Sequence, residues 1–245
     1  MPSLTSHTAT LSYDECGQGF PLLTFAPAGL QSPLVVWSRP SAPVNPTAAF
    51  AKDVRGIAME PRNAGGQSRA PLTAQDSWPT YAADHLALLA HLGIAQGPLD
   101  GQGIGGPFSC SMRKAQPQRS ASAVIAQTSG RVGPMPSRRS ANVAAWDQAL
   151  QDHPEATEQV LEAFNQHLYG PGCVSSVDRA CVARCQTPYL VLAGNDAAHL
   201  FASSEEVAQV LPHAAVIPEG KAGASLASVK MRMQQFLMAH TPVRA

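Results

Sequence analysis

Apolar residues along this chain alternate between two spacings. Short apolar runs, typical of buried strands, alternate with longer segments in which apolar residues recur at helical spacing. This alternation predicts a mostly parallel sheet with helices on both faces, an α/β fold. The predicted strands are Leu11 to Cys16, Phe20 to Phe25, Val54 to Met59, Gly97 to Asp100, Ala121 to Gln127, Pro188 to Ala193 and Ala214 to Pro218.

Local signals place the turns and the helix ends. The turn Gly17 to Gly19 predicts that the first two strands form a hairpin. Asn45 and Pro46 supply a helix cap and a first-turn proline, which predicts a helix through about Asp53. The stretch Ser203 to Glu206 has the pattern of a capping box for a helix ending near Leu211. Further helices are predicted at Ser77 to Leu92, Phe108 to Ala115, Asn142 to Leu150, Glu155 to Leu168 and Ser225 to His240.

The segment from about Gly130 to Cys185 differs in character from the rest. It opens with a polar stretch containing proline and arginine and continues with helical patterns, which predicts a small helical cap inserted into the sheet order. We therefore expect a single α/β core formed by residues 1–129 and 186–245, with the cap at 130–185. A chain of 245 residues suits one large domain of this kind.

Charge and composition restrict the classes of molecule that this protein is expected to bind. Lys plus Arg and Asp plus Glu number 17 each, so no net field attracts nucleic acid or an anionic membrane. The first residues, Met1 to His7, lack the basic and apolar regions of a signal peptide, and no long apolar run occurs. The expectation is a cytoplasmic protein whose partner is a small-molecule substrate or ligand, with a homodimer allowed.

The cysteines indicate no metal site. Five are present, in an odd number and without a C-x-x-C pair or matching histidine spacing. We expect ordinary thiols in a reducing compartment, with no metal and no cofactor.

The main chemical motif is a glycine turn that lacks a nucleophile. The segment Gly101 to Gly106 reads GQGIGG and lies between a predicted strand and a predicted helix. This is the outline of the G-x-S-x-G nucleophile elbow, except that its central residue, Gly103, has no side chain. Covalent serine chemistry at this position is thereby excluded.

From about Leu11 to His240 the chain resembles the α/β-hydrolase superfamily. The resemblance rests on the elbow, on Ala26-Pro27-Ala28-Gly29, on Met59 to Ser68 and on Gly194-Asn195-Asp196, in this order. It implies the α/β-hydrolase fold. In that family the elbow side chain attacks a carbonyl, a histidine after the last strand takes its proton, and an acid orients the histidine.

Asp196 matches the acid position of the family. The segment Glu219 to Ser225, where the histidine is expected, contains none. Two of the three triad functions are therefore predicted to be absent.

The resemblance also implies an oxyanion site made of backbone donors. The Ile104 N–H lies at a predicted helix start, and a second donor is expected from the amide of Ala28 or Leu30. His199, three residues after Asp196, is the best available general acid or base, although a solvent-facing loop histidine is an equal alternative. Trp78 either lines the pocket or packs in the core.

Three other polar residues are assigned structural roles. His85 lies on the apolar face of a predicted helix and is expected to be packed. Cys110 lies about two turns into the helix after the elbow, too far along it to act as the nucleophile. Arg62 is expected to tie loops together.

The sequence favours one function over two alternatives. The favoured function is non-covalent, non-hydrolytic enzyme chemistry (cyclisation, isomerisation, or a lyase-type elimination or cleavage) on a small natural-product-like substrate, using the pocket and the oxyanion site, because the glycines of the elbow and the Gly194-Asn195-Asp196 loop are intact. The second is a catalytically silent pseudo-hydrolase that binds a small molecule. The third is a hydrolase in which His199 and Asp196 activate water directly.

Overall fold

We analysed a computed structural model of the chain. It describes residues 1–25, 27–39, 44–128, 141–147, 150–169, 174–196, 199–218 and 224–241.

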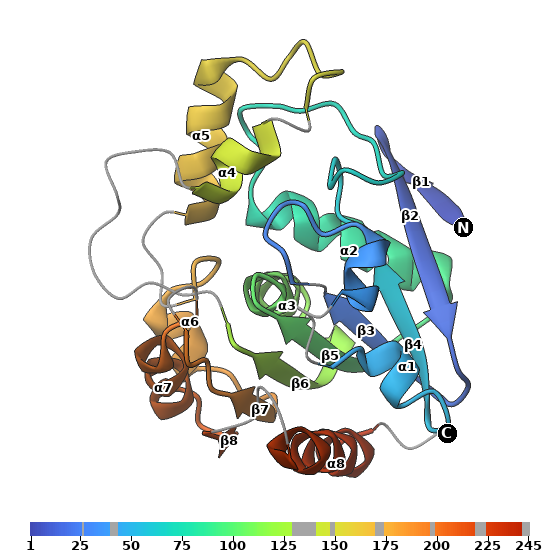
Figure 1. Ribbon diagram of the computed structural model, residues 1–245, viewed down its shortest axis with the longest axis vertical. Coiled ribbons are helices and arrows are strands. Elements are labelled where there is room, and N and C mark those ends of the chain that lie inside the picture. Colours follow the sequence, from blue (N-terminus) through green and yellow to red (C-terminus); the bar gives the residue numbers. More distant parts are fainter. Residues whose placement is uncertain are drawn as a thin grey trace.

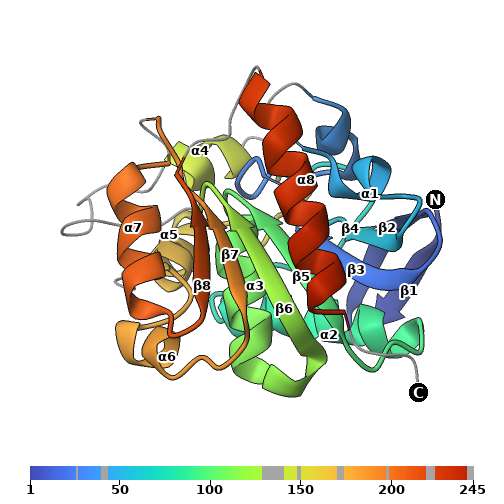
Figure 2. The same ribbon diagram turned by 90° about the horizontal axis from the view of Figure 1, so that it is seen from below.

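The described residues form one eight-stranded sheet in the order β1-β2-β4-β3-β5-β6-β7-β8. Strand β2 runs antiparallel to β1 and β4, and all the other neighbours are parallel. Figure 2 shows the strands side by side with their right-handed twist. The mostly parallel α/β sheet predicted from the sequence is confirmed. Its strands are β1 (Ser3–Ser6), β2 (Ala9–Cys16), β3 (Phe20–Phe25), β4 (Val54–Met59), β5 (Gly97–Gln102), β6 (Ser120–Ala126), β7 (Tyr189–Leu192) and β8 (Ala214–Ile217).

The predicted hairpin between the first two apolar runs is wrong. Strand β4 lies between β2 and β3, so β2 pairs with β4 and with β1, a strand that the sequence analysis missed. The physical reason is burial: β3 is buried on both faces and belongs inside the sheet, whereas the Asp14–Cys16 end of β2 is exposed. Strand β1 was missed because only Leu4 among its residues is buried.

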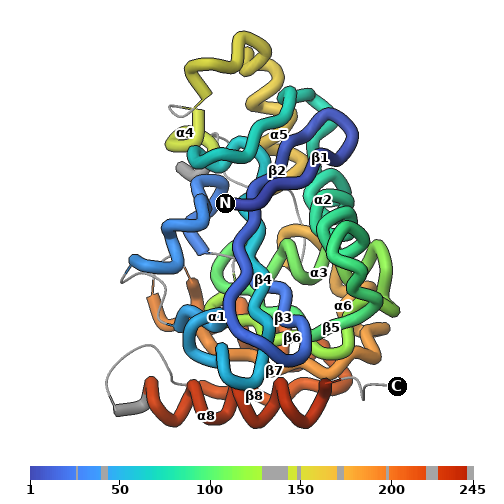
Figure 3. Tube along the Cα trace, turned by 90° about the vertical axis from the view of Figure 1, so that its right-hand side faces the viewer, coloured from blue at the N-terminus to red at the C-terminus, as the bar shows by residue number. Residues whose placement is uncertain are grey.

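Alternate strand residues enter two separate cores. Leu22 of β3 and Val124 of β6 pack with Met233 of α8 (Ala224–Ala239) on one face. On the other face Leu23 and Ile125 pack with α2 (Trp78–His91) and α3 (Gly105–Ala115). Figures 1 and 3 show α8 beneath the sheet and α2 and α3 above it. Helices therefore cover both faces, as predicted.

Of two helix starts predicted from capping residues, one is confirmed and the other is wrong. Helix α1 (Pro46–Ala49) begins as predicted, with the Asn45 side chain accepting a hydrogen bond from the Ala48 N–H, but it ends before Asp53. Helix α7 (Phe201–Val210) begins before the predicted capping box, so Ser203 and Ser204 lie inside it and are buried. The Ser204 hydroxyl instead accepts the Gly194 N–H at 3.1 Å.

Between β6 and β7 lie α4 (Ala141–Asp147), α5 (Glu158–Tyr169) and α6 (Arg179–Ala183). Figure 1 shows α4 and α5 above the sheet, and α6 beside α7. Two indole N–H groups tie this region to the core: Trp146 donates to the Asn63 carbonyl at 2.6 Å, and Trp78 donates to the Leu168 carbonyl at 3.1 Å. The polar entry at 129–140 lies outside the described residues, so the cap boundaries stay a prediction.

Arg62 and His85 have the structural roles expected of them. The Arg62 guanidinium makes two 2.8 Å bonds to the Asp84 carboxylate of α2 and lies 3.5 Å from Asp76, which fastens the loop after β4. His85 is buried, its Nδ1 lies 2.7 Å from the Tyr81 carbonyl, and burial lowers its pKa to about 4.

One buried carboxyl gives the fold a testable pH dependence. Asp100 of β5 is fully buried, and burial raises its pKa to about 7, although the Gln102 amide donates to it at 3.3 Å. Unfolded aspartate ionises near pH 4, so between about pH 4 and about pH 7 the native state holds a proton that the unfolded chain has lost. Asp100 therefore costs stability as the pH rises across this window, by up to roughly 1.4 kcal/mol per pH unit.

We predict that Asp100→Asn removes this slope. Its stability relative to the original chain should increase steadily from about pH 4 to about pH 7, measured by urea unfolding at constant ionic strength. Parallel stability curves for the two proteins across this range would contradict the assignment.

Candidate active site

The glycine turn has the strand–turn–helix geometry of an elbow. Strand β5 ends at Gln102, Gly103 takes the left-handed φ of +55°, and α3 begins at Gly105. The Gly103 N–H donates to the Ala126 carbonyl at 2.9 Å, and its carbonyl accepts the Gly106 N–H at 3.2 Å. A Cβ on Gly105 would collide with the Phe25 carbonyl, so the turn can approach β3 this closely only because residue 105 is a glycine.

The space above Gly103 faces an imidazole. A Cβ built on Gly103 would lie 3.4 Å from His199 Nε2 and 3.5 Å from Pro27 Cβ, both ordinary contacts. A small side chain could stand there without collision, yet the sequence provides none.

His199 is held by Asp196. Its Nδ1 lies 3.0 Å from Oδ1 and 3.2 Å from Oδ2 of that carboxylate, and the His199 backbone N–H donates to Oδ1 at 2.8 Å. Because an ionised carboxylate only accepts hydrogen bonds, Nδ1 carries the proton of the neutral ring. The lone pair on Nε2 is then directed at the elbow.

The surroundings favour a neutral ring. The His199 side chain is 25% exposed, and burial lowers its pKa below the usual value of about 6.5. At neutral pH the imidazole is therefore a base, and the Asp196 carboxylate stabilises the imidazolium that forms when it takes a proton.

A glycine allows the loop after β7 to close. A Cβ on Gly194 would collide with the His199 carbonyl and lie 2.7 Å from the His199 Cβ. The Gly194 N–H donates to the Ser204 hydroxyl of α7, which fixes the start of the loop. These contacts bring His199 over the sheet edge where the elbow ends.

An imidazole lies beside the elbow, although the segment in which the family's histidine is expected contains none. The sequence analysis expected both the nucleophile and the base to be absent, because residues 219–225 contain no histidine. Residues 219–223 lie outside the described residues, but His199 brings an imidazole to the elbow from the loop after β7. The pairing of Asp196 with His199 three residues later was the signal in the sequence.

The amides predicted as oxyanion donors belong to residues next to the elbow or in the loop after β3. The Ile104 N–H, at the start of α3, donates to none of the described residues. Pro27, for which the sequence predicts no role of its own, puts its Cα 3.7 Å from the Cβ position of Gly103. Its neighbour Ala28 is exposed, whereas the Leu30 side chain is buried in the core.

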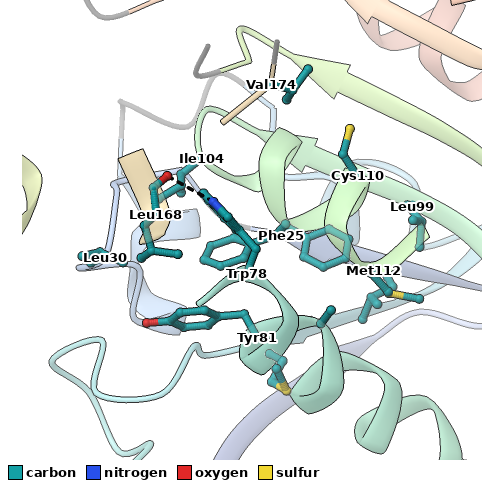
Figure 4. Close-up of a cluster of buried hydrophobic side chains, with 14 of the residues drawn as sticks. Phe25, Leu30, Trp78, Tyr81, Leu99, Ile104, Cys110, Met112, Leu168 and Val174 are labelled. Carbon is teal, nitrogen blue, oxygen red and sulfur yellow. Dashed lines mark hydrogen bonds between the residues drawn. The ribbon is translucent and has the colours of Figure 1, made fainter. Parts of the chain in front are cut away.

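Trp78 is buried in the core. It is 4% exposed, and its ring packs edge-on against Phe108 with centroids 5.2 Å apart. Figure 4 shows its indole nitrogen bonded to Leu168 within the buried cluster. This position agrees with the packing alternative considered for this residue.

The described thiols offer no second nucleophile near Gly103. Cys110 is buried, lies 3.9 Å from the Tyr189 hydroxyl, and has its pKa raised by burial to about 12. All four described cysteines are free. Among the described residues no cluster of His, Cys, Asp and Glu could hold a metal, and no helix is long and apolar enough to span a membrane.

Comparisons with known proteins show similarity in structure only. No family model and no curated protein matches the sequence. Among solved structures, an enol-lactonase from Burkholderia xenovorans matches with a TM-score of 0.68 at 19% identity, covering 97% of this chain and 100% of the other. An esterase from Thermogutta terrifontis matches with a TM-score of 0.68 at 18% identity, covering 98% and 100%.

A further match is a meta-cleavage product hydrolase from Pseudomonas fluorescens, with a TM-score of 0.69 at 14% identity, covering 98% and 97% of the two chains. The likeness extends over nearly the whole chain in each case. Together with the sheet order and the glycine elbow, it shows that this chain has the α/β-hydrolase fold.

Proposed function

We propose that this protein hydrolyses a small carboxylic ester or lactone by direct attack of water, with His199 as the general base. The observation that carries the proposal is the 3.4 Å separation between His199 Nε2 and the Cβ position of Gly103. The imidazole nitrogen thus lies beside the position that a nucleophile occupies in an elbow, and in this proposal a water takes the place of the absent side chain.

The reaction needs no group beyond those at the elbow. A water oxygen forms a bond to the substrate carbonyl carbon while Nε2 of His199 takes one of its protons. The Ile104 N–H and a second amide from the Ala28 loop stabilise the resulting oxyanion. The C–O bond then breaks, and the departing alkoxide receives the proton from Nε2, which yields an acid and an alcohol.

The names of the structural neighbours support hydrolysis over the other two functions. An enol-lactonase, an esterase and a meta-cleavage product hydrolase share the fold, although their low identities transfer no activity. Isomerisation or elimination would use the same His199 as its base. A silent binding protein would have no use for a base at the elbow.

Oxygen tracing separates these alternatives. The protein should hydrolyse p-nitrophenyl esters or γ-lactones without a burst phase, and in H₂¹⁸O the label should enter the acid product. A product that keeps every substrate atom and takes up no ¹⁸O would support isomerisation. Binding without turnover across these probes would support the silent alternative.

Removal of the base should abolish most of the rate. We predict that His199→Ala lowers kcat by about 10²–10⁴-fold, the range for loss of a general base, with little change in affinity. His213→Ala, at an exposed histidine after α7, is the control and should leave kcat unchanged. A normal rate in His199→Ala would exclude this histidine from the mechanism.

The pH profile should follow the imidazole. Because the pKa of His199 is lowered by burial, its basic form predominates above about pH 6.5, and kcat/KM should reach a plateau there. On the acid side the rate should fall tenfold per pH unit, as Nε2 becomes protonated. A profile that falls as the pH rises through neutrality would contradict a histidine base.

A single hydroxyl at the elbow should convert the site to covalent chemistry. We predict that Gly103→Ser becomes labelled by a fluorophosphonate probe and gives a burst with p-nitrophenyl acetate, because its Oγ would stand beside His199 Nε2. The original protein should stay unlabelled. Gly103→Ala is the matched control, since it carries the same Cβ and the same left-handed backbone cost of roughly 1–2 kcal/mol.

Two results would contradict the geometry assigned to His199. One is labelling of the Gly103→Ala variant, and the other is a folded Gly103→Ser variant that stays unlabelled.

A further inference from the structure

The loop after β3 contains a strained residue beside the elbow. Ala28 has φ +102°, a conformation that a residue with a Cβ rarely adopts, and the next residue, Gly29, has φ +63°. Such strain persists only where the surroundings fix the chain, and it is common at functional sites. Pro27, immediately before Ala28, contacts the Cβ position of Gly103.

A buried serine holds this loop in place. The Ser32 side chain is 1% exposed, and its Oγ lies 2.8 Å from the Pro27 carbonyl oxygen and 2.8 Å from the Gly29 carbonyl oxygen. Two carbonyls therefore converge on one hydroxyl group.

The positions of these carbonyls fix the directions of two amides. In a planar trans peptide the N–H points opposite to the C=O, and the described residues contain no cis peptide. With the Pro27 carbonyl directed at Ser32, the Ala28 N–H must point the other way, and the Leu30 N–H is oriented likewise by the Gly29 carbonyl. Neither N–H donates to any described residue. These are the two amides that the sequence left as alternatives for the second oxyanion donor.

We infer that Ser32 is a positioning residue that directs the Ala28 N–H into the oxyanion site. Ala28 is chosen over Leu30 because its peptide follows Pro27, the residue in contact with the elbow, and because Ala28 is exposed while the Leu30 side chain is buried. This inference deepens the proposed function and rests on it for its kinetic test.

The kinetic test is Ser32→Ala. Without the hydroxyl the Ala28 peptide can rotate, so an interaction made only in the transition state weakens. Loss of a whole oxyanion donor costs about 10²–10³ in kcat, so loss of its orientation should lower kcat about 10-fold to 100-fold with little change in KM.

Ser68→Ala is the matched control. Ser68 is also a buried serine, accepts the Ser12 N–H at 2.9 Å and donates to the Glu60 carbonyl at 3.0 Å, in the loop after β4. The Ser68→Ala variant should lose thermal stability as Ser32→Ala does, but its kcat should equal that of the original protein. Equal kcat values in the two variants would overturn the inference.

A second measurement is independent of turnover and of any variant. Phenylphosphonate, a tetrahedral anion, is titrated into the ¹⁵N-labelled original protein, and its amide signals are followed by NMR. We expect the Ala28 and Ile104 signals to shift together and the Leu30 signal to stay. A shift at Leu30 in place of Ala28, or at neither, would overturn the inference.

The two arms separate this inference from the proposed function. If the original protein hydrolyses no ester or lactone probe, the proposed function fails, and the phosphonate titration alone decides whether Ala28 is an oxyanion donor.

Discussion

The hydrogen bond between the Asp196 carboxylate and His199 Nδ1 is the interaction on which this site depends. It fixes both the tautomer and the direction of the ring, so that the unprotonated Nε2 faces Gly103. Without it the imidazole would be one more partly exposed loop histidine. With it, an unprotonated ring nitrogen lies beside an elbow that has no nucleophile, which is the arrangement that the proposed attack by water requires.

Close contacts between backbone segments, more than charged side chains, position the loops around Asp196 and His199. The glycine at 105 lets the elbow approach β3, and the glycine at 194 lets the loop after β7 approach its own start, more closely than a Cβ would permit. Buried hydroxyls then fix these loops: Ser204 holds the Gly194 amide, and Ser32 holds the carbonyls on either side of Ala28. In the proposed mechanism, the donors and the base are thereby positioned before a substrate arrives, which reduces the reorganisation that the reaction requires.

Most of the fold could be predicted from the sequence, because strand burial and helix spacing are local patterns. The hairpin error marks the limit: the turn at Gly17 to Gly19 was a valid local signal, but β4 pairs between the two strands, and pairing partners are decided by the whole sheet. Similarly, Ser203 and Ser204 fit a capping pattern that tertiary packing overrides. At the site, the family resemblance predicts Asp196, and the position three residues later predicts His199. That the ring reaches Gly103 required the closure of the loop at Gly194, which sequence spacing does not encode.

The tautomer and the pKa of His199 test the central claim most directly. In ¹⁵N NMR of the imidazole nitrogens across a pH titration, the account predicts a neutral ring above about pH 6.5 with the proton on Nδ1 and Nε2 unprotonated. Asp196→Asn should remove the preference for this tautomer. A proton on Nε2 at neutral pH, or an imidazolium that persists well above pH 7, would contradict a base poised at the elbow.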